Sequence, residues 1–143
     1  MHFAFKNMDL KTLAKMYLER FLSKSGKQFK IVEVNEDSKM KKYLDFVILV
    51  PSTGERIGVL VKDWKKSVGV DVIIRFSRVL RELNFTMGII IANRFSDLAM
   101  DRLKRSHEIV PLTRSQIITD LINEKFLQLK FSQSDIEGFE QSN

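Results

Sequence analysis

Residues 43–62 run Tyr-Leu-Asp-Phe-Val-Ile-Leu-Val-Pro-Ser-Thr-Gly-Glu-Arg-Ile-Gly-Val-Leu-Val-Lys, and this stretch decides the fold. Two apolar runs, over 44–50 and 56–62, flank a turn at 51–55, a pattern that predicts a β-hairpin. Both runs stay apolar along most of their length. We therefore expect burial on both faces, as at the centre of a sheet covered by helices.

The segments on either side of the hairpin predict further helices and strands. Asp9 is a good N-cap for a first helix that ends near Gly26. The other expected elements are a strand over 29–34, a polar loop over 35–42, helices over 70–83 and from Ser96 to about 105, strands over 87–92 and 109–112, and a last helix from Thr113 or Ser115 to about 125. This order predicts an α/β fold in three layers, with a mixed central sheet flanked by helices.

Composition limits the kinds of protein that fit this fold. The 143 residues suit a single domain over 1–143, with a core over about 8–125 and a polar, frayed tail after Phe131. The absence of cysteine excludes disulfides and cysteine zinc sites, and two histidines are too few for a histidine-rich metal site. The apolar runs are too short to span a bilayer, and the start lacks a signal-peptide pattern, so we expect a cytoplasmic protein without membrane contact.

Positive charge is concentrated on the body of the chain. The net charge of +6 divides into +4 over residues 1–50, +4 over 51–110 and −2 over 111–143. A basic body favours a polyanionic partner such as a nucleic acid, although solvated lysines and arginines alone give the same composition.

Asp45 opens the first strand of the hairpin, and Lys62 closes the second. Metal-dependent cleavage of a phosphodiester needs carboxylates to hold Mg²⁺ and a cation near the attacking water. Asp45 is therefore a candidate metal ligand, and Lys62 a candidate for positioning the water. Leu60 faces the same side as Lys62, because side chains alternate along a strand, and it stands where a second acid or an amide is expected. Without further context, Asp45 has a structural interpretation as well: it pairs with Lys62 or caps the strand end.

The order of elements and these residues resemble the Mrr-type restriction endonuclease domain of the PD-(D/E)XK nuclease superfamily, to which archaeal Holliday junction resolvases also belong. The resemblance extends over about residues 8–122 and rests on Asp45, Lys62, Trp64, the pair Val68-Gly69, the stretch 88–96, Ala99 and the stretch 109–112. It implies a restriction-endonuclease-like fold, DNA as the partner, and Mg²⁺ as the cofactor if the chain is catalytically active. Related resolvases are dimers, which makes a homodimer an expectation.

The chain departs from the family pattern at the metal site. Leu60 replaces the usual glutamine or glutamate, and the loop over 38–42 is basic instead of acidic and glycine-rich. The glutamate common on the family's first helix has no clear counterpart. Glu19, Glu33 and Glu36 are the candidates for a migrated carboxylate.

Three hypotheses follow for the function. The favoured one is a degenerate nuclease that binds DNA with weak or no cleavage. The alternative is an active Mg²⁺-dependent endonuclease, of Mrr or resolvase type, completed by a migrated carboxylate. The third is a structural module that binds a protein partner. In the first two, the expected contacts with DNA are Lys39, Lys41, Lys42, Lys65 and Lys66.

Overall fold

The hairpin forms as expected in the computed structural model, which describes residues 5 and 7–125. Strands β2 (Phe46–Val50) and β3 (Glu55–Lys62) pair antiparallel, with Phe46 opposite Val59. Gly54 has a φ angle of 77°, a left-handed conformation that a glycine adopts without strain and that closes this turn. The expectation of a frayed tail after Phe131 concerns residues outside the described part.

Five strands form one mixed sheet in the order β1-β2-β3-β4-β5. Strand β1 (Lys30–Glu33) pairs antiparallel with β2. Strand β4 (Met87–Ala92) runs parallel to β3, and β5 (Ile109–Thr113) runs parallel to β4. The hairpin is therefore joined to a parallel half, and the expected mixed sheet is confirmed.

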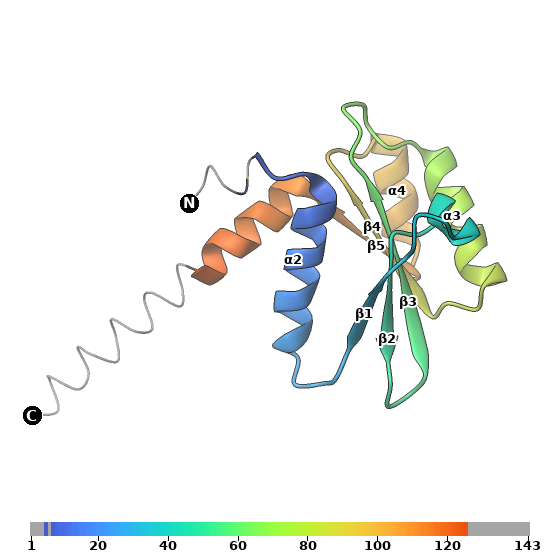
Figure 1. Ribbon diagram of the computed structural model, residues 1–143. Coiled ribbons are helices and arrows are strands. Elements are labelled where there is room, and N and C mark those ends of the chain that lie inside the picture. Colours follow the sequence, from blue (N-terminus) through green and yellow to red (C-terminus); the bar gives the residue numbers. More distant parts are fainter. Residues whose placement is uncertain (1–4, 6, 126–143) are drawn as a thin grey trace, which may run out of the picture.

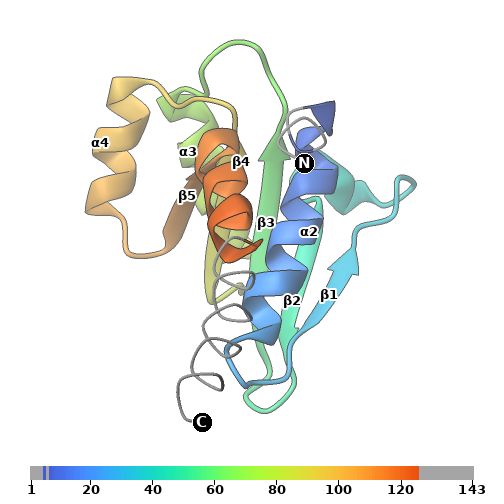
Figure 2. The same cartoon turned by 90° about the vertical axis from the view of Figure 1, so that its left-hand side faces the viewer.

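Helices cover both faces of the sheet (Figure 1). Helix α2 (Leu10–Ser23) and the helix over 114–125 lie side by side on one face, as Figure 2 shows. Helices α3 (Val70–Glu82) and α4 (Asp97–Arg105) lie on the other. Each face has its own apolar core, and β3 contributes to both. The expected three-layer arrangement is confirmed.

The predicted helix starts are confirmed by their caps. The side chains of Asp9 and Ser96 accept hydrogen bonds from the N–H groups of Thr12 and Ala99. Of the two residues considered for the last helix, Thr113 is the cap, since its Oγ1 accepts from the N–H of Gln116 at 3.1 Å. In each case the side chain satisfies one of the free N–H groups of a first helical turn.

The segment over 35–42 differs from the polar loop that was expected. It contains a short 3-10 helix, η1 (Lys39–Lys42), which begins where the Ser38 side chain accepts from the N–H of Met40. The Met40 side chain packs against the core on the α3 face. The Ser38 cap and the apolar contact of Met40 therefore stabilise a helical turn in a segment whose lysines predicted a loop. Within the described residues, no helix has the length and apolar character needed to cross a membrane.

Candidate functional site

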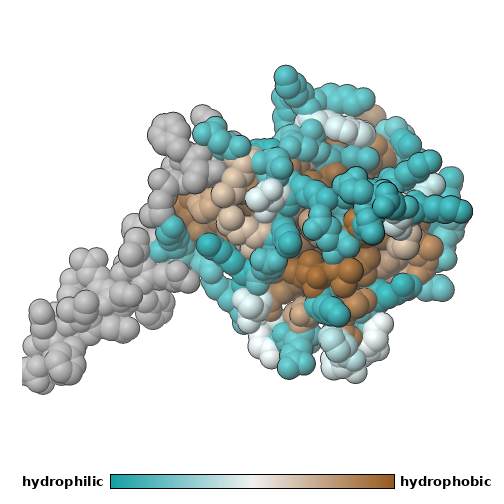
Figure 3. All heavy atoms as spheres, viewed as in Figure 1, coloured by the Kyte–Doolittle hydropathy of each residue, from teal (hydrophilic) through white to brown (hydrophobic). Residues whose placement is uncertain are grey.

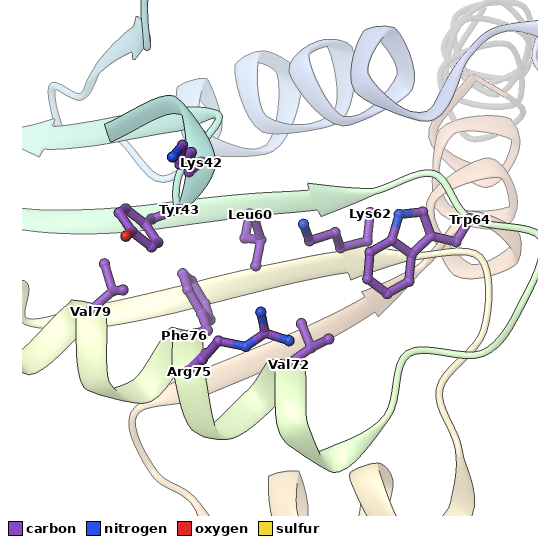
Figure 4. A pocket seen from close by; sticks show the side chains of 9 residues that line it. All are labelled: Lys42, Tyr43, Leu60, Lys62, Trp64, Val72, Arg75, Phe76 and Val79. Carbon is purple, nitrogen blue, oxygen red and sulfur yellow. The ribbon is translucent and has the colours of Figure 1, made fainter. Parts of the chain in front are cut away.

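The second half of β3 directs Leu60 and Lys62 toward α3, and a pocket of about 380 Å³ opens beside them. Leu60 is buried and belongs to the core on this face. Figure 4 shows Lys62 extending along the strand and Arg75 reaching toward it from α3. The residues that line the pocket are Lys42, Tyr43, Leu60, Lys62, Trp64, Val72, Arg75, Phe76 and Val79.

The lining of this pocket combines cations, aromatic rings and an apolar floor. Its three charged residues, Lys42, Lys62 and Arg75, are all basic. The Lys62 ammonium lies 4.9 Å from the ring centre of Trp64, a cation–π contact. Arg75 also forms an exposed ion pair with Asp71, one turn earlier on α3, at 3.2 Å, but Asp71 does not line the pocket. Since the side chains that face the pocket carry only positive charge, it suits a phosphate and not a metal ion.

Asp45 lies directly before β2 and is bound on both of its carboxylate oxygens. Its Oδ2 atom accepts a hydrogen bond from the N–H of Val61 at 2.7 Å. Its Oδ1 atom lies 3.3 Å from the ammonium of Lys41, on η1. The Asp45 and Lys41 side chains keep only 14% and 19% of their surface exposed. The Lys41 Nζ atom is buried and interacts with Asp45 through charge, without the geometry of a hydrogen bond. The ion pair with Lys62 that the sequence suggested is not found among the described residues, and Asp45 pairs with Lys41 instead.

Two of the three candidate acids lie in the same group of charges as Asp45. Glu36 Oε1 lies 3.6 Å from the Lys41 ammonium. Glu33 pairs with Lys11 at 2.9 Å, and the Lys11 ammonium in turn lies 4.0 Å from Glu36 Oε1. The hydrogen bond and charge of Lys11 lower the pKa of the Glu33 carboxyl. Glu19 lies elsewhere, in a depression that Phe29, Ile31 and Pro51 also line.

These residues do not fit a Mg²⁺ ion of the kind that the family resemblance implies. Mg²⁺ needs oxygen ligands in octahedral geometry, usually from one or two carboxylates. Here an ammonium occupies one side of the Asp45 carboxylate, and Leu60 offers no ligand. Among the described residues, no group of three histidine, aspartate or glutamate side chains is arranged to hold a metal.

The lysines expected to contact DNA lie in different surroundings. Lys42 lines the pocket, and Lys39 lines a neighbouring depression. Lys65 and Lys66 follow β3 and are exposed, and the Lys66 ammonium lies 4.9 Å from the Trp64 ring centre. Lys41 differs from the rest, because its ammonium is turned inward to Asp45. Arg75, which the sequence did not distinguish from other arginines of its helix, completes the lining.

A polar network that the sequence did not predict ties together the ends of four elements. Asp63 accepts hydrogen bonds from Asn93 at 2.9 Å, from Arg114 at 3.1 Å and from the N–H of Leu10 at 3.2 Å. Asn93 also donates to the carbonyl of Trp64 at 2.8 Å. The hydrogen bond from Asn93 lowers the pKa of the Asp63 carboxyl the most, and the hydrogen bonds from Leu10 and Arg114 lower it further. Partial burial acts in the opposite direction and raises this pKa. The network fixes the end of β3 beside the pocket.

Comparisons with known proteins agree with this fold. A repair endonuclease from Pyrococcus abyssi is 14% identical, with a TM-score of 0.50, over 71% of this chain and 44% of that one. The MspJI restriction endonuclease, solved in complex with a 27-mer oligonucleotide, is 14% identical, with a TM-score of 0.53, over 82% of this chain and 28% of that one. This chain thus spans less than half the length of either structure, and the likeness shows a shared restriction-endonuclease-like fold.

A separate comparison with curated proteins found no match to this sequence. The Mrr_cat family, described as restriction endonuclease, matches residues 5–121. That range takes in the whole sheet, Asp45, Lys62 and the start of the last helix. The chain therefore belongs to the Mrr-type restriction endonuclease family, as the resemblance predicted.

Proposed function

We propose that this chain is a DNA-binding member of its family that does not cleave by the usual metal-dependent mechanism. The observation that carries the proposal is the state of Asp45, whose carboxylate is bound by the Lys41 ammonium and by the N–H of Val61. Leu60 removes the second metal ligand from the neighbouring position of β3. Both changes remove metal-binding capacity while the fold and Lys62 remain.

The pocket supplies the chemistry for binding DNA. Lys42, Lys62 and Arg75 face one space, and no acidic side chain of the described residues lines it. Phosphates are held by lysine and arginine, and each contact releases a counterion, so the binding should depend strongly on salt. The MspJI structure with an oligonucleotide, which has the same fold, supports DNA as the ligand.

Binding can be tested through its dependence on salt. We expect Lys62→Ala and Arg75→Ala each to weaken the binding of labelled duplex DNA and to reduce the slope of log K against log salt by about 1. Lys27→Ala is the matched control: it removes the same charge from an exposed residue that lines the depression with Glu19. A wild-type chain that binds no DNA at low salt contradicts the proposal. It is also contradicted if Lys27→Ala weakens DNA binding as much as Lys62→Ala and Arg75→Ala do.

Cleavage is tested on linear, supercoiled and branched DNA with Mg²⁺ or Mn²⁺. We expect the wild type, Asp45→Ala and Lys62→Ala to leave all three substrates intact. Cleavage by the wild type that both substitutions abolish would instead establish an enzyme that uses these residues.

One observation favours the alternative, an active endonuclease with Mg²⁺ and a migrated carboxylate. Glu36 contacts the same Lys41 ammonium that contacts Asp45, so the two carboxylates share one neighbour. If the chain cleaves DNA, this alternative predicts that Glu36→Gln abolishes cleavage, whereas Glu19→Gln leaves it unchanged. A homodimer and a cytoplasmic location stay predictions, and sedimentation of the purified chain tests the former.

A further inference from the structure

The pocket beside Lys62 continues into a second depression of about 430 Å³. Both are lined by Tyr43, Arg75 and Val79, so they form one groove between η1 and α3. The groove follows α3 from Val72 to Leu83, a length of roughly 16 Å at the rise of an α-helix. It is long enough for a short run of nucleotides.

Basic side chains border the groove along both walls. Lys39 and Lys42 stand on the η1 wall, and Arg75 and Arg78 on the α3 wall. Among the residues that the structure describes, the one acid in the two linings is Glu82, near the C-terminal end of α3. Hydrophilic side chains gather over η1 and α3 in Figure 3, and the apolar surface in that view lies below them. A charged backbone that follows such a groove meets cations on both sides.

Two aromatic rings stand in or beside this charged border. Tyr43 lies where the two depressions meet and keeps 46% of its surface exposed. Trp64 lies at the other end of the groove, with the ammoniums of Lys62 and Lys66 each 4.9 Å from its ring centre. Trp64 is half-buried and packs against the core, so Tyr43 is the exposed ring of the two. An exposed ring beside cations is the combination that binds unpaired bases, since a base stacks on the ring while the cations hold the phosphates.

We propose that the groove binds a single-stranded segment of DNA, with a base stacked on Tyr43 and the phosphates held by Lys42, Lys62 and Arg75. This inference rests on the proposed DNA-binding function and narrows its substrate. Paired bases in a duplex are stacked on one another and present phosphates without free base faces. A duplex can therefore use the cations of the groove but gains little from Tyr43.

The test compares a short fluorescein-labelled thymidine oligonucleotide with a labelled duplex at the same salt concentration. We expect Tyr43→Ala to weaken binding of the single strand roughly 5- to 150-fold, the range for loss of one stacked base. Binding of the duplex should change by no more than about twofold, as for an ordinary surface substitution. Tyr43→Phe keeps the ring and should retain the affinity of the wild type for the single strand.

Trp64 offers a second and direct readout, because it is the single tryptophan of the chain. We expect the single strand to quench its fluorescence more strongly than the duplex does. The inference is overturned if Tyr43→Ala weakens the binding of both DNA forms equally, or does not weaken the binding of the single strand. It is also overturned if thymidine monophosphate binds as tightly as the oligonucleotide. If the inference fails in one of these ways but the duplex still binds with a strong dependence on salt, the proposed DNA-binding function stands. If neither DNA form binds, both the proposed function and this inference are refuted.

Discussion

Replacing Asp45 tests whether its carboxylate has become a structural group. The Asp45→Asn variant keeps an oxygen for the N–H of Val61 but removes the negative charge 3.3 Å from the Lys41 ammonium. Breaking a buried ion pair by removing one partner costs about 3–5 kcal/mol. Some exposure of both side chains and the nearby Glu36 reduce this cost, so we expect a loss of about 2–3 kcal/mol in the free energy of unfolding.

The assay is urea denaturation followed by the fluorescence of Trp64, which packs against the core on the α3 face. Asp45→Asn, Lys41→Met and the double variant complete a thermodynamic cycle. We expect a coupling energy of about 1–3 kcal/mol between the two residues, so that the double variant is more stable than the sum of the single losses implies. Coupling below about 0.5 kcal/mol would refute the pairing and leave Asp45 free for another ligand.

Three further predictions concern the frame around the groove. Since the pKa of Asp63 is lowered in the folded chain, its contribution to stability is present above its unfolded pKa and is lost as the pH falls through the lower folded value. Urea denaturation at neutral and acidic pH should then show a smaller acid loss in Asp63→Asn than in the wild type, and an equal loss contradicts this. A Cβ atom at Gly88 would lie 2.5 Å from Leu80 Cδ1, so Gly88→Ala should destabilise the fold by about 1–3 kcal/mol in the same assay, and unchanged stability would show that α3 moves away freely. Ser96→Ala removes the cap of α4 and should cost about 1 kcal/mol, seen as a lower denaturation midpoint, whereas Ser96→Asp should retain the wild-type midpoint.

The sequence predicted the fold well, because the signals for its elements are local. Asp9 and Ser96 mark helix starts, and the two apolar runs of the hairpin set the centre of the sheet. Local signals also placed Leu60 and Lys62 on one face, since strand alternation needs no knowledge of the rest of the chain.

The surroundings of the site could not be predicted in the same way. Asp63 and Arg114 form a hydrogen bond although they are 51 residues apart in the sequence, and no periodic pattern of residues predicts such a contact. The loop lysines looked equivalent, yet Lys41 turns inward and Lys42 outward, because η1 winds them onto different sides. Arg75 belongs to the groove only because α3 packs beside β3.

The pairing of Lys41 with Asp45 has a mechanical consequence for the groove. The short helix η1 forms one of its walls, and no residue of this helix is fully buried. The apolar contact of Met40 and the ion pair of Lys41 with Asp45 both attach this wall to the sheet. The carboxylate that the family resemblance makes a metal ligand thus anchors one wall of the groove in this structure. A substitution at Lys41 made to reopen a metal site would loosen that wall at the same time.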